Sequence, residues 1–266
     1  MILPTESVER MGGEVCVGRQ AGRVAVVTGA ARGLGRAFAA ALAAEGASIV
    51  LADINESVLT ATSEALSRDG ALVEPLVVDV TSPEDIHRMI ATTLDGFGRL
   101  DVLVNNAGQF PLQNIEAISL DEWRAVFAVN LEAVFLGIRE AIAPMKRAGY
   151  GRIINITSGT VFHGTPGLSH YVASKAGVIG LTRSAASELG AHGITVNAIA
   201  PSLTLTEGIQ EDPRMLEFAD KRIATRAVAR HAVPEDLVPA LLFLASPAAS
   251  FVTGQTISVS GGEIKL

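Results

Sequence analysis

Tyr171, Lys175 and Ser158 are the residues whose types and spacing best suit the movement of a proton. Tyr171 and Lys175 stand four positions apart, so on a helix their side chains lie on one face, one turn from each other. An ammonium group beside a tyrosine stabilises the phenolate and lowers its pKa from the usual value near ~10. Such a tyrosine can give a proton to a developing alkoxide or take one from an alcohol, and Ser158 can hydrogen-bond the same oxygen. We therefore predict a general acid/base at Tyr171.

A glycine-rich turn between Thr28 and Gly35 has the composition of a site for a phosphate-containing ligand. It follows the apolar run 24–27 and precedes an alanine-rich stretch, so it joins a predicted strand to a predicted helix. Glycines in such a turn let the chain bend sharply and approach a pyrophosphate, while the helix N-terminus offers free N–H groups. The residues expected to contact a dinucleotide here are Gly29, Arg32, Gly33, Leu34 and Gly35.

Asp53 ends the next predicted strand, 24 residues after Gly29, where the adenosine ribose of a dinucleotide would lie. Its carboxylate can accept hydrogen bonds from both ribose hydroxyls and would repel a 2′-phosphate, which favours NAD over NADP. Arg32 points weakly the other way, since a guanidinium can pair with that phosphate. Further strand ends add candidate contacts in the same crevice, namely Asp79, Val80, Asn106, Ala107 and Gly108.

Strand and helix patterns alternate along the chain and would bring these residues to one edge of a sheet. Short β-branched runs alternate with longer amphipathic stretches, which is typical of a parallel sheet with helices on both faces, and most of the strands are apolar enough to be buried. The predicted strands are Val24–Thr28, Ser48–Ala52, Leu72–Val78, Asp101–Val104, Arg152–Thr157, Ile194–Ala200 and Thr256–Val259. The predicted helices are Gly33–Glu45, Glu56–Arg68, Pro83–Asp95, Leu120–Arg147, His170–Leu189 and Pro234–Ala245. We expect an α/β fold of Rossmann type, a doubly wound, seven-stranded parallel sheet.

The chain is expected to form one domain behind a short arm. Its 266 residues and 48% hydrophobic content suffice for a single large core, and no linker interrupts the pattern. We predict a flexible arm over residues 1–22 and a single domain over 23–266. Within it, a long segment of mixed charge near 202–230 breaks the strand–helix rhythm at Pro213, and we interpret it as a substrate lid.

Charge and cysteine content argue against several classes of partner. Lys and Arg total 21 against 28 Asp and Glu, a formal charge of −7, so we expect neither nucleic acid nor membrane as a partner. The lone Cys16 forms neither an internal disulfide nor a metal site, which fits a reducing, cytoplasmic location. The first 22 residues are interrupted by charges and resemble neither a secretory signal nor a membrane span.

These motifs together resemble the short-chain dehydrogenase/reductase family. The resemblance rests on the turn 28–35, on Asn105–Gly108, on Ser158 and on the run Tyr-Val-Ala-Ser-Lys over residues 171–175, and it covers nearly all of residues 23–262. It implies that a hydride moves between nicotinamide and a carbonyl or alcohol carbon.

The resemblance also assigns roles to further residues. Asn130 would complete the catalytic set with Ser158, Tyr171 and Lys175 by holding a water on a proton path from Lys175. The segment 195–206 would lie beside the nicotinamide, although Ser202 and Ser260 stand where the family usually has glycine and aspartate. The contacts expected on the nicotinamide half of the cofactor are Tyr171, Lys175, Pro201, Thr204 and Thr206.

Three functions fit these observations. The first is an NAD(H)-dependent oxidoreductase acting on a small or aryl-substituted secondary alcohol or ketone, because Asp53 favours NAD and residues 200–203 resemble arylethanol-type members. The alternative is a 3-oxoacyl-(acyl-carrier-protein or CoA) reductase using NADPH, which would gain from a basic docking patch that Lys146, Arg147 and Arg152 supply only sparsely. The third is a regulator that binds a dinucleotide without turnover, against which the intact catalytic set argues.

Substrate contacts and assembly complete the expectations. By resemblance, the helices predicted at 120–147 and 170–189 pair across a two-fold axis and lead to a homotetramer. The residues expected to contact the substrate are Ser158, Tyr171, Gln109, Phe110, Thr160, Phe162, His163 and Leu203.

Overall fold

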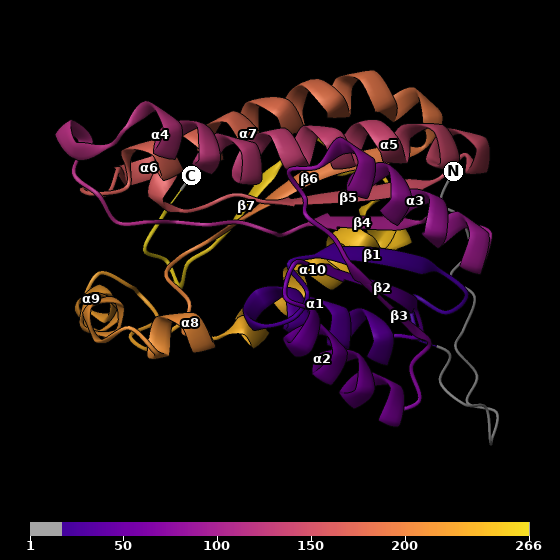
Figure 1. The fold of residues 1–266 in the computed structure, drawn as a ribbon, viewed down its shortest axis with the longest axis horizontal. Helices are drawn as coiled ribbons and strands as arrows, with labels where there is room; N and C mark the ends of the chain where they lie inside the picture. Colours follow the sequence, from indigo (N-terminus) through magenta and orange to yellow (C-terminus); the bar gives the residue numbers. More distant parts are fainter. Residues whose placement is uncertain (1–17, 266) are drawn as a thin grey trace, which may run out of the picture.

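Seven parallel strands form one sheet in the order β3-β2-β1-β4-β5-β6-β7 (Figure 1). The structure is a computed structural model that describes residues 18–265. The strands are β1 Val24–Thr28, β2 Ser48–Asp53, β3 Val73–Val77, β4 Val102–Asn105, β5 Gly151–Ile156, β6 Ile194–Pro201 and β7 Thr256–Val259. The predicted doubly wound sheet is confirmed. Its order reverses between the neighbours β1 and β4, where ligands bind in such folds, at the carboxyl ends of the strands.

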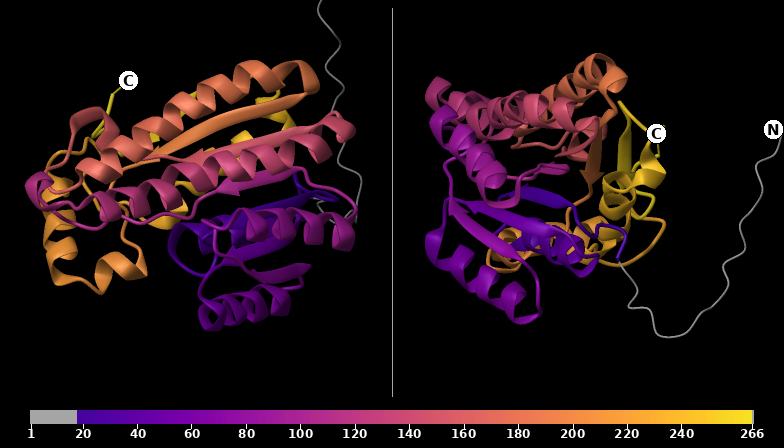
Figure 2. Two further views of the ribbon diagram at one scale, coloured as in Figure 1. Left: turned by 45° about the horizontal axis from the view of Figure 1, so that its top comes forward. Right: turned by 90° about the vertical axis from the view of Figure 1, so that its right-hand side faces the viewer.

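Helices cover both faces of this sheet. One layer of buried side chains joins α3, α5 and α7 to the sheet and a second joins α1, α2 and α10 to its other face, so the strands lie between two cores. Figure 1 shows α5 and α7 above the strands and α1 and α2 below them, and Figure 2 shows the same layers from two further sides. The helices are α1 Gly33–Ala44, α2 Glu56–Arg68, α3 Pro83–Phe97, α4 Leu120–Phe127, α5 Ala133–Ala148, α6 Thr160–His163, α7 Ser169–Leu189, α8 Glu207–Gln210, α9 Pro213–Ile223 and α10 Val238–Ala245.

Burial follows the position of each strand in the sheet. Every residue of β1, β4, β5 and β6 is buried, as the apolar runs predict for central parallel strands. The edge strand β3 differs, because it has a neighbour on one side only and Glu74 and Pro75 are exposed.

The helix predicted over 120–147 is interrupted in the structure. It begins as α4, with Ser119 and Glu122 forming a capping box, and continues as α5 after a π-helical turn over Ala128–Glu132. A π turn inserts one extra residue into the helical repeat, and such turns are frequent at functional sites. The buried Asn130 lies inside it.

The segment predicted as a lid, residues 202–230, contains two helices. Asp212 caps α9 by accepting the N–H of Arg214, and Pro213 occupies the first helical position. Ile209, Met215 and Ala219 form a small core that is separate from the two main ones. Figure 1 shows α8 and α9 on the left, beyond the carboxyl ends of the strands. We keep the name lid for residues 202–230, and their closing over a substrate stays a prediction.

Residues 18–22, which the sequence assigns to a flexible arm, are attached to the domain. The N–H of Gln20 donates to the carbonyl oxygen of Glu45, and the side chain of Gln20 is buried. The rest of the predicted arm, with Cys16, lies outside the described residues. Within residues 18–265 no helix combines the length and the apolar character needed to cross a membrane.

Candidate active site

Ser158, Tyr171 and Lys175 meet in one cleft. Ser158 follows the end of β5, and Tyr171 and Lys175 lie one turn apart on α7, so a strand end and a helix face supply the three groups. The Ser158 hydroxyl lies 2.9 Å from Oγ1 of Thr160 and accepts the N–H of Thr160 at 3.2 Å. The ring of Phe110 packs edge-on against Tyr171, with centroids 6.1 Å apart.

The Lys175 side chain is fixed to the carboxyl end of β5. Its Nζ donates to the carbonyl oxygen of Ile156 at 2.8 Å, and Oγ1 of Thr157 donates to the carbonyl oxygen of Lys175. Because the side chain is buried, the pKa of Lys175 falls to about 8. The ammonium of Lys175 therefore gives up its proton more readily than that of an exposed lysine.

Burial also shifts the pKa of Tyr171, in the direction opposite to our expectation. It raises the pKa of Tyr171, and a hydrogen bond with Ser158 lowers it by less. Nζ of Lys175 lies 6.0 Å from the centre of the tyrosine ring, and within residues 18–265 it donates its hydrogen bond to the backbone carbonyl oxygen of Ile156. The predicted lowering of the Tyr171 pKa by Lys175 is therefore wrong, because burial raises this pKa and only Ser158, within residues 18–265, lowers it.

Asn130 holds the loop that follows β4. Its Oδ1 accepts the N–H of Gln109 at 2.9 Å, and its Nδ2 donates to the carbonyl oxygen of Gln109 at 2.9 Å and to Oγ of Ser174 at 3.1 Å. A Cβ on Gly108 would lie 3.2 Å from Oδ1 of Asn130 and 3.4 Å from Nζ of Lys175. The three residues are thus adjacent, and Asn130 fixes the backbone of Gln109, while its place on a proton path stays a prediction.

The turn after β1 forms a close-packed cradle. Gly29 has a φ of +63°, and a Cβ on Gly35 would overlap the carbonyl oxygen of Gly29. Asn106, at the end of β4, donates from Nδ2 to the carbonyl oxygens of Thr28 and Gly29 at 2.9 and 3.1 Å. The N–H of Ala107 donates to Oγ1 of Thr28 at 3.1 Å. The predicted turn, Asn106 and Ala107 are therefore brought together across the switch point of the sheet.

Asp53 lies at the end of β2, beside this turn. Its Oδ2 accepts the N–H of Ala31 at 3.0 Å and its Oδ1 accepts the N–H of Asn55 at 3.0 Å. A carboxylate has about four acceptor positions, so each oxygen retains capacity for a ribose hydroxyl. Arg32 is turned toward the lid instead, with NH1 3.6 Å from Oε2 of Glu211.

A negatively charged side chain lies where the turn would receive a pyrophosphate. The carboxylate of Glu207, the first residue of α8, accepts the N–H of Gly33 at 3.0 Å and pairs with Arg36. The N-terminus of α1 therefore accommodates an anion, as the fold requires for a dinucleotide. Arg36 and Glu207 carry no motif of their own, and the sequence analysis did not find them.

Asp79 and Val80 follow β3, the outer strand. Oδ1 of Asp79 accepts the N–H and the hydroxyl of Thr81, which closes the turn into α3, and Val80 is largely buried against the core. Neither residue lines the cleft that holds Ser158 and Tyr171. Their predicted contacts with the cofactor stay predictions.

The cleft has a volume of about 370 Å³ and mostly apolar walls. The predicted residues that line it include Leu34, Asn106, Gly108, Phe110, Thr160, His163, Pro201, Leu203, Thr204 and Thr206. Two predicted substrate contacts lie elsewhere. The amide of Gln109 donates to the carbonyl oxygen of Ala125. Phe162 lines a separate cavity with Arg183, because on the single turn of α6 only Thr160 and His163 face the cleft.

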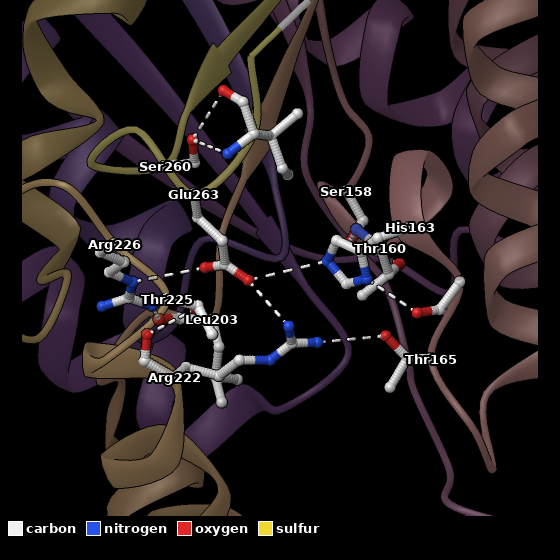
Figure 3. A network of polar contacts seen from close by, with 12 residues as sticks. Ser158, Thr160, His163, Thr165, Leu203, Arg222, Thr225, Arg226, Ser260 and Glu263 are labelled. Atoms are coloured by element: carbon white, nitrogen blue, oxygen red, sulfur yellow. Dashed lines mark hydrogen bonds and ion pairs between the residues drawn. The ribbon is translucent and has the colours of Figure 1, made fainter.

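A charged network closes the end of the cleft toward the lid (Figure 3). The carboxylate of Glu263 lies 3.0 Å from NH1 of Arg222, 3.4 Å from Nε of Arg226 and 3.7 Å from Nε2 of His163. NH2 of Arg222 reaches Oγ1 of Thr165 at 3.5 Å. Only His163 was predicted, because Glu263 and the arginines are remote in sequence from every motif.

The two departures from the family pattern are accommodated without strain. Ser202 follows β6 with a negative φ, and its N–H donates to the carbonyl oxygen of Val259 at 3.2 Å, although its buried hydroxyl has no partner among the described residues. Oγ of Ser260 accepts the N–H of Ile264 at 3.1 Å, which bends the chain so that Glu263 points into the network (Figure 3).

Known proteins resemble this chain over almost its whole length. Residues 29–263 match the family model described as Enoyl-(Acyl carrier protein) reductase. A 3-oxoacyl-(acyl-carrier-protein) reductase of Synechocystis is 40% identical over 248 residues, which cover 91% of this chain and 97% of that protein. A 3-alpha-(or 20-beta)-hydroxysteroid dehydrogenase of Mycobacterium tuberculosis is 40% identical over 247 residues, covering 93% of this chain and 91% of that protein.

Solved structures of known proteins have the same fold as this chain. Levodione reductase superposes with a TM-score of 0.87 at 32% identity, covering 91% of this chain and 98% of that chain. A short-chain type dehydrogenase/reductase from Mycobacterium marinum superposes with a TM-score of 0.87 at 30% identity, covering 93% and 97%. The chain therefore belongs to the short-chain dehydrogenase/reductase family, whose members bind a nicotinamide dinucleotide, and it is an oxidoreductase acting on CH–OH or keto groups.

Proposed function

We propose that this protein is an NAD(H)-dependent dehydrogenase/reductase of secondary alcohols and ketones, with Tyr171 as the general acid/base. The observation that carries the proposal is the meeting of Ser158, Tyr171 and Lys175 in one largely apolar cleft beside the turn after β1. The same cleft has room for a small or aryl-substituted substrate, which Phe110 and Leu203 would contact.

In the proposed reaction the chain moves the proton. A bound dinucleotide supplies the acceptor of hydride in oxidation and its donor in reduction. Tyr171 takes the proton of the alcohol in oxidation and returns it to the developing alkoxide in reduction. Ser158 hydrogen-bonds the same oxygen and orients it, while Lys175 holds the ribose of the nicotinamide half.

The preference for NAD rests on Asp53. Its carboxylate lies at the end of β2 with acceptor capacity left for two ribose hydroxyls, and its negative charge would repel a 2′-phosphate. Arg32, the residue that could favour NADP, is paired with Glu211. We therefore infer NAD as the cofactor.

One assay tests cofactor and substrate class together. Purified protein is incubated with NAD or NADP and a panel of secondary alcohols, aryl alcohols and 3-hydroxyacyl thioesters, and the absorbance of reduced nicotinamide is followed. We expect kcat/KM to be much higher with NAD, and Asp53→Ala to shrink that difference. A wild-type preference for NADP would overturn the assignment.

The second candidate is a 3-oxoacyl thioester reductase that uses NADPH, and the names of similar proteins favour it. The basic patch considered for docking a carrier protein is weaker than the sequence indicated. Arg152 is buried, with its guanidinium over the ring of Tyr150 at 4.2 Å, so only Lys146 and Arg147 remain exposed. Faster turnover of the thioesters than of the simple alcohols would favour this candidate.

We also propose that the protein is a homotetramer. The exposed side chain of Phe135 lies on α5, within the helical region expected to pair, and the tetramer would cover it. Light scattering at micromolar concentration tests the assembly, and a monomer would contradict it.

A further inference from the structure

Glu207 connects the lid directly to the cradle of the dinucleotide. One carboxylate oxygen accepts the N–H of Gly33 at 3.0 Å and the other pairs with Arg36 on the first turn of α1. A second lid carboxylate, that of Glu211, lies 3.6 Å from Arg32. The lid therefore presents two negative charges to the turn that follows β1.

The contact with Gly33 supplies a hydrogen-bond acceptor that the N-terminus of α1 lacks. Arg32 at the N-cap makes no side-chain hydrogen bond to the helix, and the first turn contains no acidic residue. By contrast, Asn55 caps α2 and Ser82 caps α3, each from the adjacent position. The free N–H of Gly33 is thus satisfied by a residue 174 positions away along the chain.

The same group is the one that the pyrophosphate would use. N–H groups at the start of the helix after the first strand bind the pyrophosphate in this fold, because they are unpaired and the helix dipole favours an anion. One N–H cannot serve a carboxylate and a phosphate together, and the two anions repel each other. The two occupants are therefore mutually exclusive.

We infer that Glu207 competes with the pyrophosphate of the dinucleotide for the N-terminus of α1, so that the dinucleotide must displace a carboxylate of the lid before it is seated. The inference rests on the proposed function, which places the pyrophosphate at this turn. Glu207 is thus a residue that sets the affinity for the cofactor without contributing to the chemistry.

The exchange is feasible because the lid is held here by exposed charges. The side chain of Arg36 is about half exposed, so it can exchange the carboxylate of Glu207 for a phosphate oxygen. Ile209, two positions after Glu207, belongs to the separate core of the lid, so α8 can leave the turn without opening either main core. If the lid occupies the cradle for most of the time, removing the carboxylate raises the apparent affinity by the inverse of the free fraction.

The test measures binding, independently of turnover. NADH is titrated by its fluorescence into wild-type protein and into the Glu207→Gln and Glu207→Ala variants, after circular dichroism and thermal melting have verified their folding. We expect the Kd to fall by roughly 5- to 10-fold in Glu207→Ala, and by less in Glu207→Gln, whose uncharged amide oxygen still accepts the N–H of Gly33. Glu211→Gln is the matched control, because it removes a lid carboxylate that does not touch Gly33, and we expect a change of less than about 2-fold.

Adenosine supplies the second arm, since it fills the ribose and adenine positions but carries no phosphate. Its Kd, measured by displacement of NADH, should be the same in the wild type and in Glu207→Gln. Unchanged or weaker NADH binding by both Glu207 variants would overturn the inference, and so would an equal tightening for adenosine. If the wild-type protein bound no NADH at all, the proposed function would fail and this inference with it, so the two failures are distinguishable.

Discussion

The catalytic residues and the lid face each other across one cleft but are held in place by different interactions. Asn130 and Lys175 are buried and bonded to backbone carbonyls, at Gln109 and Ile156. The lid touches the cofactor turn through Glu207 and Glu211, which pair with exposed arginines. Exposed ion pairs contribute little stability and are screened by salt, whereas buried hydrogen bonds are not. The catalytic residues are thus held by buried hydrogen bonds, whereas the contact of the lid with the cofactor turn rests on exposed ion pairs.

The largest expected effect is on the rigid side, where Tyr171→Phe removes the transferable proton and keeps the ring that packs against Phe110. We expect kcat to fall by roughly 10²- to 10⁴-fold. The Kd for NADH should stay within about 2-fold, because the hydroxyl acts on the substrate. Steady-state kinetics and fluorescence titration measure the two quantities.

Tyr150→Phe is the matched control for this variant. Tyr150 lies just before β5, at the opposite end of that strand from Ser158, and its ring contacts the guanidinium groups of Arg23 and Arg152, so kcat should be unchanged. If folded Tyr171→Phe protein turned over substrate at close to the wild-type rate, Tyr171 would not be the acid/base.

The next effect concerns the pH dependence of stability. It compares the buried Lys175 with an exposed lysine, Lys221. The pKa of Lys175 is about 8 in the folded protein, below the value of ~10.4 for an unfolded chain. Between these values the unfolded state binds more protons, so the free energy of unfolding rises with pH. We expect this lysine to add about 2 kcal/mol between pH 7.5 and 9.5.

Denaturant titrations of wild-type and Lys175→Met protein at these two pH values measure the difference. The variant should lose the rise. Lys221→Met is the control, because Lys221 lies exposed on α9 and pairs with the exposed Glu217, so its rise should equal that of the wild type. An equal rise in Lys175→Met would contradict the buried-lysine explanation.

The smallest effect tests the attachment of the lid at the far end of the cleft. Glu263→Gln keeps the size of the side chain but removes the charge that Arg222, Arg226 and His163 share. A hydrogen bond to a charged group contributes about 1.5 kcal/mol, which corresponds to a ~10-fold rise in the KM for substrate. We expect kcat to change less, since Glu263 does not touch the proton-transfer groups.

Glu217→Gln is the control for this variant, since Glu217 lies exposed on α9, the helix that carries Arg222, and pairs with Lys221. Its KM should match that of the wild type. A fall in kcat without a rise in KM for Glu263→Gln would show that Glu263 acts on catalysis and not on the lid.

The strands and the catalytic motif could be predicted because their signals are local. β1 and β7 begin and end at the predicted residues, since apolar β-branched runs end sharply at turn residues. The run from Tyr171 to Lys175 lies on one helix, so its spacing alone places both side chains on one face.

Other features depend on contacts between residues that are distant in the sequence. The way the lid and the turn after β7 fold back brings three further residues to the site, and no short sequence pattern indicates them. They are Glu207, Arg222 and Glu263. The direction of the Tyr171 pKa also escaped prediction, because spacing shows that Lys175 is near but not that its Nζ bonds Ile156. Burial is a property of the whole fold.

The π-helical turn at Ala128–Glu132 sets the direction that α5 faces relative to α4, because the three segments follow one another without a break. An α-helix turns through about 100° per residue, so one inserted residue rotates everything after it by about that angle. Before the turn α4 packs against α7, and after it α5 packs against β4 and β5, with Ala141 and Met145 in the core. Loss of a single residue from the turn would leave a regular helix, but the apolar stripe of α5 would be rotated by about 100° from its contact with the sheet. The number of residues in this turn is therefore fixed by the packing of α5.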